Sequence, residues 1–181
     1  MLKKICVFML IVLCAFPVTT VMAKNNPVKL NIDEVIQEKT NWCWAASAQC
    51  VSDYLGGDGL SQSKIVKNVK GKNVNEGANA KEQKQALNVD GIDTNYTSSN
   101  ISFSKIKKMI GEWSSPILVH IEWSSGGAHA VVIYGYYDDS KAISYMDPWG
   151  DNSRWNFSSY SNFKSNDDFT WIRTYYENAV S

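Results

Sequence analysis

The sequence predicts an α+β fold, in which a helical N-terminal part packs against an antiparallel β-sheet formed by the C-terminal part. Residues 42–113 contain four segments with helical apolar spacing or helix-capping residues. Residues 117–176 contain five short β-rich runs separated by glycine, proline, aspartate or serine. Helices followed by strands are typical of an α+β architecture and not of alternating βαβ units.

The first 23 residues resemble an export signal and are not expected to belong to the fold. Two lysines precede an apolar run at 5–16, and residues 21–23 form a cleavage site with small side chains. The run is too short to span a bilayer as a stable helix. Cys14 lacks the preceding small residue that a lipoprotein signal needs. We therefore expect one mature domain, 24–181, exported to the periplasm or secreted and without a membrane anchor.

Composition and charge exclude several classes of function. The formal net charge of the 181-residue chain is zero and its lysines are scattered, so neither nucleic acid nor an anionic membrane surface is an expected partner. Removing Lys3 and Lys4 leaves 16 basic and 18 acidic residues. The mature chain has two histidines and two cysteines, too few for a dedicated zinc cluster, so we expect no metal or organic cofactor. We expect a monomer.

The first predicted helix covers residues 42–55. This segment lacks proline and glycine and is rich in small side chains, which is typical of a buried central helix. Asn41 is its predicted N-cap, and Gly56-Gly57 is its predicted stop. In one helix, Cys43 and Cys50 lie about 10 Å apart, whereas a disulfide requires Cα atoms within about 7 Å. At least one free thiol is therefore expected.

The remaining elements follow from caps and from apolar periodicity. Residues 24–40 read as an irregular lead-in. Three further helices are predicted at 62–70, 80–88 and 103–113. Their predicted N-caps are Ser61, Asn79 with Glu82 as a capping box, and Ser102. The last helix places an apolar face at Ile106, Met109, Ile110 and Trp113. The predicted strands are 117–123, 129–137, 141–146, 154–157 and 169–176.

Cys43 is the candidate nucleophile. It lies in the first turn of the predicted central helix, where unpaired backbone N–H groups and the helix dipole favour an anion. A thiolate in such a position can act as a nucleophile at neutral pH. The alternative is that a cysteine flanked by Trp42 and Trp44 is simply a buried small hydrophobic residue.

His129 is the candidate base. It follows a Ser-Ser-Gly-Gly-Ala loop and opens an apolar strand, a junction from which a rigid sheet can present an imidazole into a cleft. The other histidine, His120, lies inside a predicted strand, where packing is its expected role and catalysis the alternative.

Asp147 and Gln37 complete the candidate set. Asp147 ends a predicted strand 18 residues after His129, so its carboxylate could orient the imidazole, although Asp-Pro is also a common turn starter. Gln37 lies six residues before Cys43. Its amide, together with the Cys43 backbone N–H, could stabilise the oxyanion that develops during acyl transfer.

These residues and their neighbours resemble the motifs of the papain-like cysteine peptidases. The likeness is to the compact bacterial branch, which includes secreted effector proteases of plant pathogens and, more distantly, the peptidase domains that trim bacteriocin leaders. It spans about residues 37–150, in the order glutamine, cysteine, histidine, aspartate. The matching blocks are Gln37-x5-Cys43-Trp44-Ala45, Gly127-Ala128-His129-Ala130 and Asp147-Pro148-Trp149-Gly150.

The resemblance implies a papain-like fold, with the Cys43 helix on one side of a cleft and His129 and Asp147 on the sheet side. It implies Cys43 as nucleophile, His129 as base and then acid, Asp147 as the orienting residue and Gln37 in the oxyanion hole. By the same resemblance, two tryptophans shield the His–Asp bond and pack behind the nucleophile; these are Trp149 and Trp44.

The expected function is that of a secreted cysteine endopeptidase, which hydrolyses peptide bonds through a thioester acyl-enzyme. The expected partner is a protein or peptide substrate, and a cognate inhibitor or immunity protein is a further candidate. One alternative keeps the chemistry but changes the reaction, giving a transglutaminase, a peptide ligase or a cell-wall amidase. Another is an inactive binding module, against which the intact Gln, Cys, His and Asp set argues.

Overall fold

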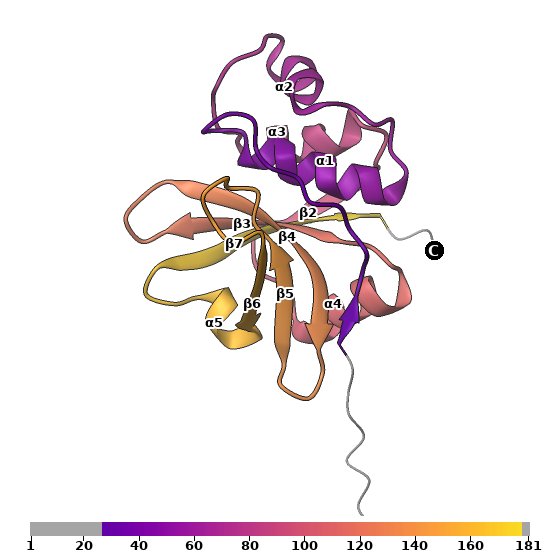
Figure 1. Cartoon of the computed structure of the whole chain (residues 1–181), viewed down its shortest axis with the longest axis vertical. Helices are drawn as coiled ribbons and strands as arrows, with labels where there is room; N and C mark the ends of the chain where they lie inside the picture. The colour runs from indigo at the N-terminus through magenta and orange to yellow at the C-terminus, as the bar shows by residue number, and fades with distance from the viewer. Residues whose placement is uncertain (1–26, 179–181) are drawn as a thin grey trace, which may run out of the picture.

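A computed structural model describes residues 27–178, so the predicted signal segment lies outside the described residues. Three helices lie together above one end of a twisted sheet (Figure 1). This is the predicted α+β arrangement, with a helical half facing a sheet half. Between residues 27 and 178, no helix is both long and apolar enough to cross a membrane.

The helical half consists of three of the four helices predicted for it, because the fourth, at 103–113, packs on the other face of the sheet. They are α1 (Cys43–Leu55), α2 (Gln62–Lys70) and α3 (Ala80–Asn88). Helix α1 is buried along most of its length and packs on the sheet, as its small side chains predict. Gly56 ends it in the left-handed conformation, at φ 77°, which glycine adopts without a Cβ clash.

The helix caps agree only in part with the sequence predictions. The capping box of α3 is confirmed, because the Glu82 N–H donates to Asn79 Oδ1 at 3.1 Å and the Asn79 N–H donates to Glu82 Oε2 at 2.8 Å. Ser61 occupies the N-cap of α2 but makes no side-chain capping bond. The prediction of Asn41 as N-cap of α1 is wrong. Trp42 holds that position, and the Asn41 amide instead donates to the carbonyl of Asn75 at 2.9 Å.

The predicted helix at 103–113 begins with its Ser102 cap but changes its period. It consists of α4 (Phe103–Lys107) and the π-helical turn η1 (Lys108–Glu112). The wider turn closes with a bond from the Trp113 N–H to the Lys108 carbonyl, at 3.1 Å. A five-residue period rotates the next side chain away from the apolar face. Trp113 is therefore 39% exposed instead of buried as predicted.

The sheet is antiparallel throughout, with strand order β2-β7-β3-β4-β5-β6, and β1 also pairs with β4. The five predicted strands are confirmed to within two residues at each end. They are β3 (Ile117–Trp123), β4 (Ala128–Tyr137), β5 (Ala142–Met146), β6 (Trp155–Ser159) and β7 (Phe169–Glu177). Three short elements were not predicted: β1 (Val28–Lys29), β2 (Thr94–Thr97) and α5 (Tyr160–Lys164).

The sheet carries a hydrophobic core on each face. Alternate residues of a strand point to opposite faces, so Leu118 and Val132 join the core under the helices, whereas Val119 and Val131 join a second core on the other face. The second core is closed by α4, η1 and α5. This double burial explains why β3 and β4 read as nearly continuous apolar runs.

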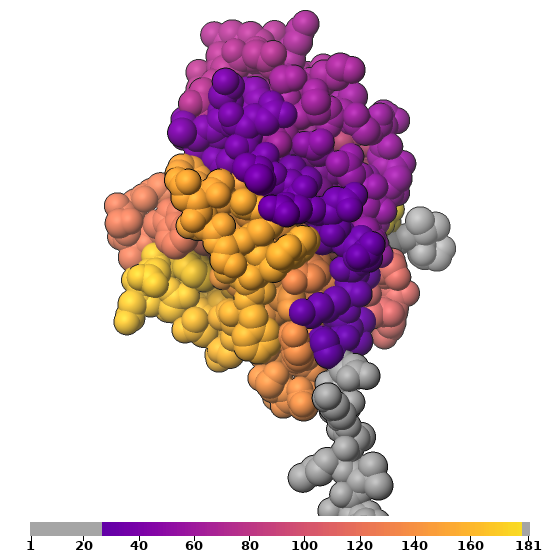
Figure 2. All heavy atoms as spheres, viewed as in Figure 1, coloured from indigo at the N-terminus to yellow at the C-terminus, as the bar shows by residue number. Residues whose placement is uncertain are grey.

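The lead-in is irregular as predicted, apart from β1, but it is tied to both halves. It runs across the front of the molecule between the helices and the strands (Figure 2). On the sheet side, the Gln37 N–H donates to the carbonyl of Pro148 at 2.9 Å. On the helical side, Gln62 accepts from the Glu38 N–H at 2.9 Å and donates to the Ile36 carbonyl at 2.8 Å. The lead-in therefore fixes the helical half against the sheet.

Candidate active site

Cys43 is the first residue of α1, at the end of the helix that faces the sheet. The first N–H groups of a helix have no intrahelical acceptor, so this position favours an anionic sulfur. The helix is anchored to β4 below this point, because the Ser47 hydroxyl donates to the carbonyl of Ala130 at 3.1 Å. Cys43 and His129 line one pocket of about 280 Å³. Cys43 and Cys50 are both free thiols, in agreement with the prediction that they do not form a disulfide with each other.

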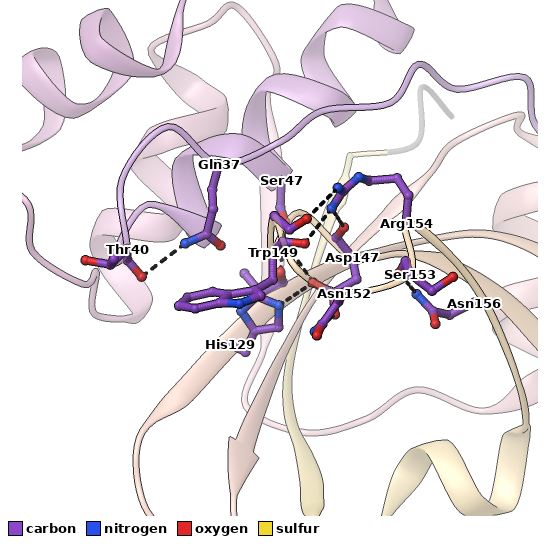
Figure 3. Close-up of polar contacts among 12 residues, drawn as sticks. Gln37, Thr40, Ser47, His129, Asp147, Trp149, Asn152, Ser153, Arg154 and Asn156 are labelled. Carbon is purple, nitrogen blue, oxygen red and sulfur yellow. Dashed lines mark hydrogen bonds and ion pairs between the residues drawn. The ribbon is translucent and has the colours of Figure 1, made fainter.

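His129 and Asp147 form a buried pair. His129 is the second residue of β4, and Asp147 directly follows β5, the neighbouring strand. The His129 Nε2 donates to Asp147 Oδ1 at 2.7 Å (Figure 3). His129 is 6% exposed and Asp147 is 7% exposed. The bond leaves Nδ1 as the ring nitrogen available to the Cys43 thiol.

The surroundings of His129 favour its protonated form. Burial by itself lowers the pKa of His129, but hydrogen bonds with Asp147 and with the Cys43 thiol outweigh burial and raise the pKa from 6.5 to about 9. At neutral pH the ring is therefore an imidazolium. The imidazolium therefore brings a positive charge to the side of the Cys43 sulfur.

Asp147 is held as an anion by three donors. Besides His129, the Trp149 N–H donates to Oδ1 at 2.9 Å and the Asn152 amide donates to Oδ2 at 2.9 Å. Burial raises the pKa of Asp147, yet these hydrogen bonds and the His129 charge lower it below its usual range. The carboxylate thus stays ionised and fixed in orientation at neutral pH.

Two tryptophan rings flank the imidazole. Trp149 meets His129 edge-on, with ring centroids 6.3 Å apart, in agreement with the shielding role that the resemblance implies. Trp123 stacks nearly parallel to the imidazole, with ring centroids 6.2 Å apart. Aromatic faces attract a cation, so Trp123 also favours the protonated ring. Trp123 was not predicted as a residue of the site. Trp123 ends β3 and its N–H donates to the carbonyl of Gly127, so the pairing of β3 with β4 places it near His129.

A loop without regular secondary structure, residues 71–79, borders the Cys43 pocket at Gly77. Indole N–H groups on either side of Cys43 hold this loop, since Trp42 donates to the Val74 carbonyl at 2.8 Å and Trp44 donates to the Glu76 carbonyl at 3.0 Å. Trp44 is almost fully buried behind the nucleophile, as the resemblance implies.

Gln37 lies near the site but is engaged elsewhere. Its amide N–H groups donate to the carbonyl of Lys39 at 2.8 Å and to that of Thr40 at 3.0 Å, and Figure 3 shows the second of these bonds. Gln37 lines a second pocket, of about 330 Å³, which shares Thr40 and Trp149 with the Cys43 pocket. To stabilise an oxyanion at Cys43, the amide would have to release one of these carbonyls. The oxyanion role of Gln37 therefore stays a prediction.

His120 packs in the interior, in line with the main expectation for it. Its Nδ1 lies 2.7 Å from the amide nitrogen of Gln83 and 3.1 Å from Arg173 Nη1. Burial, Arg173 and His129 lower the pKa of His120 to about 4, so the ring is neutral at physiological pH. In the described part of the chain, no group of three or more histidine, cysteine or acidic side chains could hold a metal ion.

The fold and the thiol–imidazole–carboxylate arrangement define a class, the cysteine peptidases with a papain-like fold. Within that class, the chain belongs to the family described as "Papain-like cysteine protease AvrRpt2", whose family model matches residues 22–168. The protein is therefore a cysteine-type peptidase. A comparison with curated proteins found no match.

Three solved structures share the fold. The peptidase domain of Streptococcus ComA, a bi-functional ABC transporter involved in quorum sensing, has a TM-score of 0.61 at 18% identity, over 83% of this chain and 98% of that one. A double glycine motif protease from an AMS/PCAT transporter has a TM-score of 0.56 at 21% identity, over 84% and 98%. UfSP from C. elegans has a TM-score of 0.54 at 15% identity, over 89% and 35%.

Proposed function

We propose that this protein is an exported endopeptidase that hydrolyses peptide bonds with Cys43 as nucleophile, His129 as acid and base, and Asp147 as the orienting residue. The observation that carries the proposal is the buried imidazole between a helix N-terminal thiol and a carboxylate, at 2.7 Å from the latter. Membership of a peptidase family supports the reaction type. Export is supported by the charged, apolar and small-residue pattern of the first 23 residues.

The mechanism follows from the protonation states. The Cys43 thiolate attacks the scissile carbonyl carbon, and the oxyanion forms near the free N–H groups that begin α1. The His129 imidazolium donates its proton to the leaving amine, which leaves a thioester on Cys43 and a neutral ring. The neutral ring then takes a proton from water, whose oxygen attacks the thioester. The acid product leaves, and the thiolate–imidazolium pair is restored.

Asp147 supports each step without exchanging a proton. Its hydrogen bond to Nε2 fixes the ring plane and directs Nδ1 toward the sulfur, as in a catalytic triad. Its negative charge stabilises the imidazolium that exists before attack and again during hydrolysis. Trp149 and Trp123 cover the ring and keep bulk water from competing for these bonds.

An extended polypeptide suits the shape of the site. The Cys43 pocket and the neighbouring Gln37 pocket share Thr40 and Trp149, so the depression extends from Cys43 toward Gln37. A binding surface longer than one residue suits a polypeptide bound across Cys43 and supports cleavage within a chain.

The proposal is tested by cleavage of a denatured peptide mixture followed by mass spectrometry of the new termini. Wild-type protein, as residues 24–181, should generate new free carboxyl termini, and Cys43→Ala should generate none. An added primary amine separates hydrolysis from acyl transfer. Products that carry the amine in preference to water would identify an acyltransferase and overturn the hydrolase assignment, and equal cleavage by Cys43→Ala would overturn the assignment of the nucleophile.

A further inference from the structure

The turn that carries the site's carboxylate lacks support from regular secondary structure. Between the end of β5 at Met146 and the start of β6 at Trp155, the backbone forms neither helix nor strand. This turn nevertheless supplies Asp147, Trp149 and Asn152, which together hold and cover the imidazole. Because catalysis depends on the position of the Asp147 carboxylate to within fractions of an ångström, some other group must fix the turn.

That group is the guanidinium of Arg154. Its Nη1 donates to the carbonyl of Asp147 at 2.8 Å and to the carbonyl of Trp149 at 2.6 Å. Its Nη2 donates to the carbonyl of Gly150 at 3.4 Å. Three carbonyls of the turn therefore converge on one cation, which Figure 3 shows lying across the turn. The planar fork of arginine suits this task, since a lysine ammonium cannot match several acceptors in one plane.

Two further contacts fix Arg154 itself. The Asp147 N–H donates to the Arg154 carbonyl at 2.9 Å, which closes the base of the turn. The Arg154 Nε donates to Glu34 Oε1 at 2.9 Å, and Glu34 belongs to the lead-in that joins the two halves. The Arg154 side chain is only 10% exposed, whereas that of Glu34 is 50% exposed. The buried guanidinium therefore holds the turn in position, and Glu34 contributes an ion pair at the surface.

We propose that Arg154 is a positioning residue for the peptidase reaction, and that it holds the turn in the shape that places the Asp147 carboxylate on His129 Nε2. The inference rests on the proposed function, because it assigns to Arg154 a role in the same catalytic pair. Arg154 touches neither the sulfur nor the imidazole. Its effect is transmitted through the backbone carbonyls of the turn, and its loss weakens the bond that keeps the ring protonated.

The two histidines make this role measurable by NMR. In wild-type protein, the His129 signal should titrate near pH 9 and the His120 signal near pH 4, so the two are separated. In Arg154→Ala, the His129 titration should move to lower pH while that of His120 stays. The chain's other arginine provides the matched control, because Arg173 lies beside His120. Arg173→Ala should move the His120 titration to higher pH and leave that of His129 in place.

Reactivity gives the second measurement. Alkylation of Cys43 by iodoacetamide near pH 6 should slow by roughly 10- to 100-fold in Arg154→Ala, the loss typical of a misplaced catalytic group. Arg154→Lys keeps the charge but not the planar guanidinium, so its alkylation rate should lie between those of wild type and Arg154→Ala. If Arg154→Ala does not fold, the rate of Arg154→Lys tests the positioning role. Glu34→Gln should alkylate at close to the wild-type rate, because the Nη donors remain.

The outcomes separate this inference from the proposed function. A wild-type His129 titration near 6.5, together with slow alkylation, would contradict the proposed catalytic pair itself. A wild-type titration near 9 that persists in folded Arg154→Ala and Arg154→Lys would leave the catalytic pair intact and overturn the positioning role. A lower melting temperature in Arg154→Ala with unchanged His129 titration and Cys43 reactivity would assign Arg154 a purely structural role.

Discussion

At the scale of single residues, the site depends on one imidazole whose protonated form is favoured by several neighbours. Asp147 and the Cys43 thiol raise the pKa of His129 to about 9 against the effect of burial, and the stacked face of Trp123 adds attraction for a cation. At neutral pH the imidazole is therefore protonated beside Cys43. Activity should persist until the imidazolium loses its proton near pH 9.

Substitutions of Asp147 test this assignment. Asp147→Ala removes the acceptor for both His129 and Trp149 and should lower the reaction rate roughly 100-fold or more. Asp147→Asn keeps an oxygen for His129, and Asn152 can rotate its amide to bond with the new one, so its loss should be smaller. In both variants the alkaline limit of activity should move below pH 9, since the carboxylate charge is gone. Equal inactivation by the two substitutions, in a pH–rate profile, would contradict the orienting role.

Substitutions of the two cysteines separate chemistry from packing. Cys43→Ala should abolish activity yet change the free energy of unfolding by less than about 1 kcal/mol, because alanine is the best helix former and the position is only half-buried. Cys50→Ala is the matched control. Cys50 is 1% exposed, and loss of its buried sulfur should destabilise the fold by about 1 kcal/mol or more while activity persists. Urea denaturation and peptide cleavage measure the two effects, and unfolding of Cys43→Ala would favour a structural cysteine.

At the scale of elements, the loop at 71–79 takes its shape from the start of the catalytic helix. Asn75 accepts from the Asn41 N–H at 2.9 Å and donates to the Thr40 hydroxyl at 2.8 Å. Together with the two indole bonds, these contacts place Gly77 at the edge of the Cys43 pocket. The loop therefore forms a wall of the substrate cleft without any helix or strand of its own.

Asn75→Ala should weaken substrate binding more than chemistry. The loop loses two hydrogen bonds, each worth about 0.5–1.5 kcal/mol, while the catalytic pair is untouched. Modification of Cys43 by a peptidyl epoxide should slow severalfold, and modification by iodoacetamide should stay near the wild-type rate. Asn73→Ala, at an exposed asparagine of the same loop, is the control and should change neither. Equal slowing of both reagents by Asn75→Ala would mean that the loop acts on the nucleophile.

Elements whose signals are local were predictable from the sequence, and those that depend on distant contacts were not. The capping box at Asn79 and the nearly continuous apolar runs of β3 and β4 are visible in neighbouring residues alone. Asn41 has the chemistry of an N-cap, yet its amide finds a better partner in Asn75, 34 residues away. The edge strand β2 is only four residues long and is held by pairing with β7, which lies about 80 residues later in the chain.

At the scale of the whole molecule, the proposed catalytic groups come from two halves, which share one hydrophobic core and are joined by the lead-in. Cys43 comes from the helical half, and His129 and Asp147 from the sheet. The motifs single out these three residues in the sequence, and their catalytic role stays a prediction. Trp123, Asn152 and Arg154 complete the site through contacts that no short motif encodes. The lead-in joins the halves at Pro148 on one side and Gln62 on the other, which the sequence of residues 24–40 does not reveal.

The same ion pair should link stability to pH. The folded-state pKa of His129 is raised, so its stabilisation is fully present below the unfolded value of 6.5 and is lost as the pH rises toward 9. The free energy of unfolding should therefore fall between pH 6.5 and 9, and His129→Ala should abolish most of that fall. Burial raises the pKa of the Cys50 thiol from 9.0 to about 12. Cys50 therefore changes the pH dependence of the free energy of unfolding only above pH 9. Identical pH dependence in wild type and His129→Ala would contradict the raised pKa.

The central claim is that His129 activates Cys43 as the nucleophile, and the rate of iodoacetamide alkylation across pH tests it most directly. Intact-mass analysis of residues 24–181 should show rapid modification at the single site Cys43. The reaction should persist well below pH 8 in wild type and should rise only near the ordinary thiol pKa, about 8.5, in His129→Ala. Slow alkylation of wild type, or a pH profile indifferent to His129, would contradict the catalytic pair.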